Sequence, residues 1–174
     1  MKMTKEELAA KLESHAKWLK TRYTDHVEGE CANLTCADLT GTNLMDANLT
    51  CANLTRANIT DADLTGANLT DADLRRANLT RANIMDADLT GAALTGANLT
   101  CADLRRAKLT GANLTFADLT DSDLTDADLM GADLTCANLE HVWRASTFVW
   151  DAILATISAR IALKRTRIEW EQHK

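Results

Sequence analysis

A five-residue unit repeats without interruption from Ala32 to Leu139, and this feature constrains the fold of the chain more than any other. The unit reads Ala-(Asn/Asp)-Leu-Thr-x in twenty-two consecutive copies, and its fifth position holds residues as different as Gly, Asp, Arg, Cys and Phe. A period of five matches neither the roughly 3.6 residues of a helical turn nor the alternation of a long strand. The backbone must turn the same way every five residues, which predicts a solenoid.

The Ala and Leu positions of each unit are expected to form the core. They lie two residues apart, so both point inward from a short extended segment, while the other three positions face water. The chain is 46% hydrophobic but only 4% aromatic, and it contains no proline, which indicates a thin core of small aliphatic side chains. Each leucine is covered only by neighbouring turns, so stability is expected to be cooperative along the stack.

The repeated run ADLTGANLT resembles the pentapeptide-repeat family, and the resemblance covers most of the chain. It implies a mainly β fold, a right-handed quadrilateral β-helix with four pentapeptides in each coil. The repeats would then form about five and a half coils stacked at the ~4.8 Å spacing of adjacent strands. In this register Lys108 would lie between Asp88 and Asp128 and relieve a ladder of like charges, and the Asn/Asp positions would hydrogen-bond the turns.

The flanks of the repeat are predicted to be helical caps. We expect an N-terminal capping helix and linker over residues 1–29, the β-helix over 30–140, and a C-terminal capping and dimerisation helix over 141–174. Thr4 and Glu7 have the spacing of a capping box at the start of the first helix, which is expected to run to Tyr23. The segment LESHAKWLK resembles the short helix that precedes the repeats in some bacterial members of the family.

The C-terminal segment has two apolar stripes at helical spacing, whereas a cap needs one. The second stripe is expected to pack against a second copy of the chain in a homodimer, because monomers rarely expose so large an apolar patch. Alternatively, the second stripe could bind a membrane surface, which Asp151 and the narrow polar flanks disfavour. The stripe assigned to the dimer interface consists of Trp143, Trp150, Leu154, Ile157, Ile161 and Ile168.

Stacking at twenty-residue intervals predicts a rod with electrically different faces. One face has a small positive net charge, and its arginines lie in the same region as an exposed phenylalanine, a combination typical of interface anchors. A tolerated exposed ring without a role is the alternative. This candidate partner surface consists of Arg56, Arg75, Arg76 and Phe116. Two other faces are acidic, and the candidate acidic surface consists of Asp63, Asp103, Asp123 and Asp126.

Catalytic, metal and cofactor sites are not expected. The repeats contain no histidine and no CxxC pair, which argues against zinc despite the stacked Cys31 and Cys51. No Ser-His-Asp, Cys-His or paired-carboxylate pocket is suggested, so the protein is not expected to be an enzyme. The net charge of −6 argues against direct nucleic-acid binding. A polar N-terminus without an apolar signal region and an odd number of cysteines favour the cytoplasm.

These observations lead to two functional hypotheses of different classes. The first is a non-catalytic protein-interaction or scaffold rod whose partner is unknown, dimeric through its C-terminal helix. The second comes from the family resemblance: a DNA-mimicking inhibitor or protector of a type II topoisomerase, with gyrase as the partner, as the quinolone-resistance members of the family are. The acidic faces would carry that mimicry.

Overall fold

The structure, a computed structural model, describes residues 3–142 of the chain. It therefore includes the N-terminal flank and all of the repeats. The predicted dimer stripe, which runs from Trp143 to Ile168, lies outside the described residues, as does all but the first two residues of the predicted C-terminal helix. The predictions made for that segment stay predictions.

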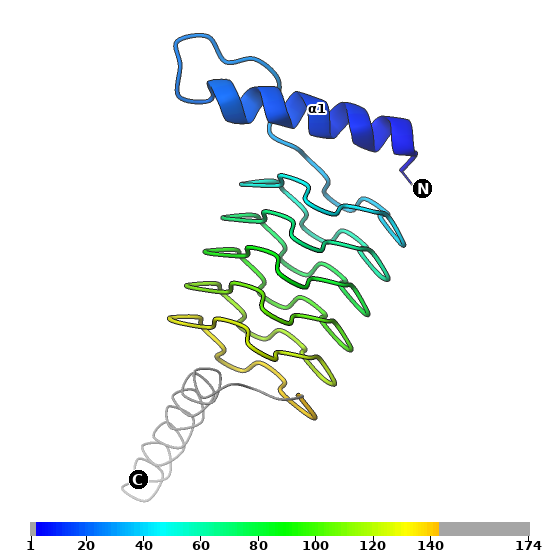
Figure 1. Cartoon of the computed structure of the whole chain (residues 1–174), viewed down its shortest axis with the longest axis vertical. Coiled ribbons are helices and arrows are strands. Elements are labelled where there is room, and N and C mark those ends of the chain that lie inside the picture. Colours follow the sequence, from blue (N-terminus) through cyan, green and yellow to red (C-terminus); the bar gives the residue numbers. More distant parts are fainter. Residues whose placement is uncertain (1–2, 143–174) are drawn as a thin grey trace, which may run out of the picture.

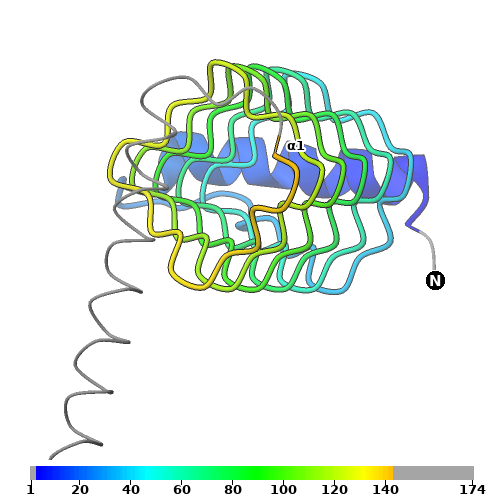
Figure 2. The ribbon, with the colours of Figure 1, turned by 90° about the horizontal axis from the view of Figure 1, so that it is seen from below.

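A ladder of parallel bridges joins residues that are twenty apart, from Asn33 with Asn53 to Asp118 with Asn138. Each bridge is a single pair at the Asn/Asp position of a unit, so four short bridged segments recur in every twenty residues. The Asn53 N–H donates to the Ala32 carbonyl over 2.9 Å, and the Leu34 N–H donates to the Asn53 carbonyl over 2.7 Å. The result is a stack of coils that follow one another along the rod (Figure 1) and have similar outlines when seen from its end (Figure 2).

A tight turn links each bridged segment to the next. The Ala37 N–H donates to the Leu34 carbonyl over 3.0 Å, and the same contact recurs from each Leu or Ile centre to the first residue of the next unit. At all twenty-two fifth positions of the units φ is positive, from 53° at His141 to 68° at Gly91 and Gly131. A positive φ at the third residue of a hydrogen-bonded turn is the mark of a type II turn.

The core consists of the Ala and Leu positions, which confirms the sequence prediction. Every Leu or Ile centre from Leu34 to Leu134 is exposed by 2% or less. The alanines are buried as well, apart from the partly buried Ala47 and Ala132. Thr42 and Ser122 replace Ala, and their hydroxyl groups differ in hydrogen bonding. The Thr42 hydroxyl donates to the Leu39 carbonyl over 2.7 Å, whereas the fully buried Ser122 hydroxyl has no hydrogen-bond partner within residues 3–142.

The Asn/Asp positions hydrogen-bond the turns, as predicted. The Asp38 carboxylate, for example, accepts from the Thr40 N–H over 3.1 Å and from the Thr40 hydroxyl over 2.6 Å. The same pair of contacts recurs in most units whose fourth residue is Thr, such as Asp63 with Thr65. Each of these side chains closes an Asx turn by accepting from the residue two positions later. Part of their hydrogen-bonding capacity is therefore used within the fold and is not available to a partner.

Helix α1 (Lys5–Thr21) lies across the open end of the first coil, as Figures 1 and 2 show. The predicted capping box is confirmed, because the Thr4 hydroxyl accepts from the Glu7 N–H and the Glu7 carboxylate accepts from the Thr4 N–H. The helix ends at Thr21, two residues before the predicted end. Its Leu8 is 8% exposed and joins the core of the coils.

Candidate interaction surfaces

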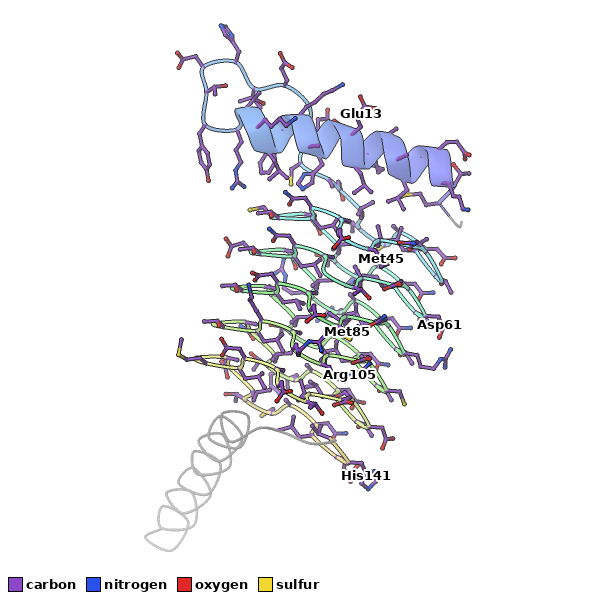
Figure 3. The ribbon with its side chains drawn as sticks, in the orientation of Figure 1. Glu13, Met45, Asp61, Met85, Arg105 and His141 are labelled. Carbon is purple, nitrogen blue, oxygen red and sulfur yellow. The ribbon has the colours of Figure 1, made fainter. Side chains whose placement is uncertain are left out.

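The outward side chains form columns that run along the rod. Residues twenty apart lie above one another, so Met45, Met85 and Arg105 follow a single line, as do Asp61 and His141 (Figure 3). The fifth positions form the most prominent columns, because each sits at the corner of a turn. Their backbone is nearly the same at every corner, so the side chains differ while the scaffold stays constant.

One corner column brings the predicted basic residues together. Arg56 and Arg76 lie in adjacent coils, since the Arg56 N–H donates to the Arg75 carbonyl over 3.0 Å. The arginines border a shallow depression of about 430 Å³. The residues that line it are Thr35, Thr55, Arg56, Arg75, Arg76 and Thr95.

Arg75 differs from its two neighbours because it is already paired. Its Nε donates to an Asp73 carboxylate oxygen over 2.8 Å. This hydrogen bond lowers the pKa of Asp73 below its usual value, although partial burial opposes it, and the same contact raises the pKa of Arg75. Within residues 3–142 no carboxylate lies within ion-pair distance of Arg56 or Arg76. The uncompensated charge of the depression therefore comes from Arg56 and Arg76.

Phe116 belongs to the same corner column, two coils beyond Arg76, and the residue is 65% exposed. Gly96 lies between them. A Cβ atom at Gly96 would come within 3.7 Å of the Arg76 Cγ, so the aliphatic stem of Arg76 extends toward this position. The structure thus places all four residues of the predicted partner surface in one region, with Phe116 separated from the arginines by the glycine.

The predicted acidic surface is interrupted by arginines. Asp103 and Asp123 do face each other in adjacent coils. However, the Arg105 Nε donates to Asp103 over 2.8 Å and lies 3.9 Å from Asp123. Burial raises the pKa of Asp103, but the contacts with Arg105 outweigh it and lower that pKa overall.

The other two members of the acidic surface lie further apart. Asp63 is separated from Asp103 by Asn83 in the intervening coil. Asp126 is a corner residue that follows Arg106 in its column, and Arg106 pairs with Asp86 one coil earlier over 2.6 Å. The acidic surface is therefore a set of separate carboxylates rather than a continuous negative strip.

The junction between α1 and the first coils contains polar contacts that the sequence reasoning missed. His15 is fully buried, and its Nδ1 accepts from the Ala32 N–H over 3.1 Å. Burial lowers the pKa of His15, the polar Thr50 backbone nearby opposes this, and the Arg22 charge adds to the lowering. The Nε2 atom of His15 is buried and has no hydrogen-bond partner within residues 3–142. The sequence does carry a sign that His15 is buried, because His15 continues the helical stripe of Leu8 and Leu12.

Arg22 completes this junction from the end of α1. Its guanidinium lies over the rings of Trp18 and Tyr23, and its Nη1 donates to the Cys51 sulfur over 3.1 Å. The Cys31 thiol donates to the Cys51 carbonyl over 3.1 Å, and burial raises the pKa of Cys31. Both thiols are free in the structure.

A second depression, of about 460 Å³, lies between α1 and the first coil. It is lined chiefly by Met3, Leu8 and Leu12 from the helical side and by Thr40 and Thr42 from the coil. In the part of the chain that the structure describes, no three His, Cys, Asp or Glu side chains gather into a possible metal site. No helix among residues 3–142 is long and apolar enough to cross a membrane.

Comparison with known proteins identifies the repeats. The model of a family described as pentapeptide repeats matches in eight copies, over residues 32–61, 57–94, 87–126 and 112–143. No curated protein matches the chain significantly.

Several solved structures are similar to the chain. HetL from the cyanobacterium Nostoc sp. strain PCC 7120, a pentapeptide-repeat protein involved in heterocyst differentiation regulation, is 35% identical; the match covers 65% of this chain and 60% of HetL, with a TM-score of 0.31. Rfr23 from the cyanobacterium Cyanothece 51142 is 27% identical, with 76% and 99% of the two chains covered and a TM-score of 0.37. QnrB1, a plasmid-mediated fluoroquinolone resistance protein, is 14% identical, with 60% and 71% covered and a TM-score of 0.39.

Proposed function

Because the chain belongs to the pentapeptide-repeat family, we propose that it is a non-catalytic protein-interaction rod. The observation that carries the proposal is the composition of the corner columns. Only six of the twenty-two fifth positions hold glycine, although φ is positive at all of them. A side chain at positive φ costs roughly 1–2 kcal/mol per residue, less for Asp. The backbone conformation of the corners therefore disfavours Arg, Cys and Phe, and those corner side chains that have no partner in the described part of the fold, such as Arg56, Arg76 and Phe116, support a role in binding.

The two depressions described above support the non-catalytic part of the proposal. The two depressions are open and shallow, and neither brings a nucleophile together with a histidine or a second carboxylate among the lining residues. A binding surface made of rigid columns suits recognition of another macromolecule better than turnover of a small substrate. The free cysteines of the described region suit a reducing compartment such as the cytoplasm.

The proposal is tested with a rod whose corners carry no side chains. We would replace the sixteen non-glycine fifth-position residues with glycine, which every corner accommodates, and verify the fold by circular dichroism. Tagged wild-type and glycine-corner rods are then expressed in the native cell, cross-linked and purified. We expect proteins that copurify reproducibly with the wild type to be lost from the glycine-corner rod. Full retention of those proteins would contradict the proposal.

The proposal includes a homodimer through residues 141–174, and its support is the sequence pattern of that segment. Light scattering would compare the intact chain with an Ile157→Asp, Ile161→Asp double variant. We expect a dimer and a monomer, respectively, because the charges would interrupt a buried apolar stripe. A dimer that persists in the double variant would show that another face is used. A monomeric intact chain that binds anionic vesicles would assign the stripe to a membrane surface.

The alternative function, mimicry of DNA toward gyrase, is favoured by the stacked Asp103 and Asp123 carboxylates. The Arg105 contacts weaken it, because they neutralise part of the charge that would imitate phosphates. We expect the purified protein to inhibit DNA supercoiling by gyrase weakly or not at all. Inhibition at low micromolar concentration that disappears in an Asp103→Asn, Asp123→Asn variant would favour the alternative.

A further inference from the structure

Two arginines of the repeats stand out because their charge is not compensated. Arg75, Arg81, Arg105 and Arg106 each form an ion pair with an aspartate of the same or the preceding coil. Arg56 and Arg76 have no such partner among residues 3–142. Their column explains why, because its other members in neighbouring coils are Cys36 and Gly96, which carry no carboxylate.

The corner conformation requires neither residue. Arg56 and Arg76 both adopt φ of 58°, a conformation that glycine adopts without strain. They also place like charges in adjacent coils, at the ~4.8 Å spacing of bridged strands, where like charges repel. Glycine at both positions would remove the backbone strain and the repulsion together, so the two arginines are best explained by something that binds them.

The surroundings of the arginines favour carboxylates as that ligand. The depression they border is also lined by the exposed Thr35, whose hydroxyl group can donate a hydrogen bond to a ligand. The Thr95 hydroxyl already donates to Asn113, and the Thr55 hydroxyl is buried. Guanidinium groups bind carboxylates through charge-assisted, often bidentate hydrogen bonds. Arg75 contributes little charge, because it is occupied by Asp73. The depression is therefore suited to two anionic side chains rather than to one.

An apolar contact lies further along the same column. Phe116 is 65% exposed, and Gly96 leaves the surface between it and Arg76 without a side chain other than the Arg76 stem. Two coils separate Phe116 from Arg76, a distance of about 10 Å. An extended peptide covers that distance with about three residues. A segment with two acidic residues followed about three residues later by an apolar one would therefore match the column.

A protein segment suits this column better than a nucleic acid does. The protein has a net charge of −6, and the faces on both sides carry aspartates that would repel a polyphosphate backbone. A short acidic segment contacts the basic corner without crossing those faces. We infer that Arg56, Arg76 and Phe116 form a binding site for an acidic, extended segment of a partner protein that also carries an apolar anchor. This inference rests on the proposed interaction function.

The test measures binding of a fluorescently labelled peptide, Glu-Gly-Glu-Gly-Gly-Leu, to the full chain at low salt. Binding is followed by anisotropy and by NMR shifts of the column's amides. An Arg56→Gly, Arg76→Gly variant is expected to bind about tenfold more weakly. The matched control is Arg81→Gly, Arg106→Gly, which removes the same charge from corners of the same geometry and is expected to change the affinity less than about twofold.

A pair of peptides tests the apolar contact with Phe116. Phe116→Gly is expected to weaken binding of the leucine peptide, and to have little effect on a peptide in which serine replaces the leucine. Glycine adopts the corner conformation without strain, so urea denaturation should show at most a small loss of stability, from the added freedom of the unfolded chain. The Arg56→Gln, Arg76→Gln pair repeats the binding test without that added freedom.

Several results would overturn the inference. They are absence of binding at millimolar peptide, equal losses in the two double variants, or tighter binding of a single-stranded oligonucleotide of equal charge. Retention of all copurifying proteins by the Arg56→Gly, Arg76→Gly rod, together with their loss from the glycine-corner rod, would overturn this site alone and leave the interaction function standing.

Discussion

The stacked coils and the junction between α1 and the first coil are both closed to water, but by different means. In the stack, Leu54 and Leu89 have the same kind of neighbours, and every unit repeats the same backbone hydrogen bonds. At the junction each contact occurs once: Ala32 donates to His15, Glu30 donates to Ser14, and Arg22 donates to Cys51. A periodic core distributes its stability over many equivalent residues, whereas the junction depends on particular side chains.

The junction is also packed less well. A depression of about 460 Å³ remains between α1 and the first coil, bordered by Leu8 and Leu12. Nevertheless Leu34 in the first coil is only 1% exposed, so α1 protects the end of the core. In a solenoid, stability is approximately a sum of unit and nearest-neighbour terms, so a weak terminal contact opens before the stack does.

The largest expected effect tests this difference in packing directly. Leu89→Ala removes a fully buried side chain that has coils on both sides, and we expect a loss of about 2–5 kcal/mol. Leu8→Ala removes a side chain that borders a depression, and a loss of about 1 kcal/mol is expected. Urea denaturation of both variants provides the measurement. Equal losses would mean that α1 packs against the first coil as tightly as one coil packs against another.

A smaller effect tests how strictly the stack excludes polar groups. Ser122 stands at an alanine position with its hydroxyl buried and unpaired within the described residues. Ser122→Ala is therefore expected to stabilise the protein by about 1 kcal/mol. Thr42→Ala is the control, because the Thr42 hydroxyl already donates to Leu39 and its removal should bring no gain. No change in the Ser122 variant would indicate that its hydroxyl rotates to the equivalent Leu119 carbonyl.

The same contrast explains what the sequence could predict. The inward Ala and Leu positions, the Asn/Asp turns and the charge relief at Lys108 all follow from one unit repeated, so twenty-two copies reinforce each inference. The capping box needed only the local spacing of Thr4 and Glu7. These features depend on neighbours at fixed intervals along the chain.

Nonperiodic contacts were harder to predict. The partner of His15 is the Ala32 backbone, and the sequence does not show how a helix of this length lies across a coil. The positive φ of the corners was also missed, because only six glycines mark them. The sequence predicted the four members of the partner surface. It did not predict that Arg75 is paired whereas Arg56 and Arg76 are not. That difference depends on side-chain directions.

A pH titration separates the junction from the stack. Burial lowers the pKa of His15, so the folded state binds this proton less readily than the unfolded state. Stability should therefore be constant above about pH 6.5 and fall as the pH drops below that value, until the folded histidine is protonated too. Trp18, which stacks on His15 at 5.6 Å, reports the change by fluorescence. A His15→Gln variant should lose this dependence between pH 7.5 and 5, and an unchanged dependence would assign it to other groups.

The smallest expected effect concerns an exposed column of the stack. Lys108 lies between Asp88 and Asp128 in the bridge ladder, and its Nζ is 3.4 Å from an Asp88 carboxylate oxygen. Lys108→Asp would place three like charges in successive coils, whereas the control Lys108→Asn restores the usual residue type of the column. We expect the Asp variant to lose less than about 1 kcal/mol relative to the Asn variant, because these groups are exposed. The loss should shrink in 1 M salt, where the screening length falls to about 3 Å. A loss that salt does not change would show that the aspartates act through hydrogen bonds instead of through charge. Asp88 accepts from Thr90 in its own turn, and Asp128 accepts from Thr110 in the preceding coil.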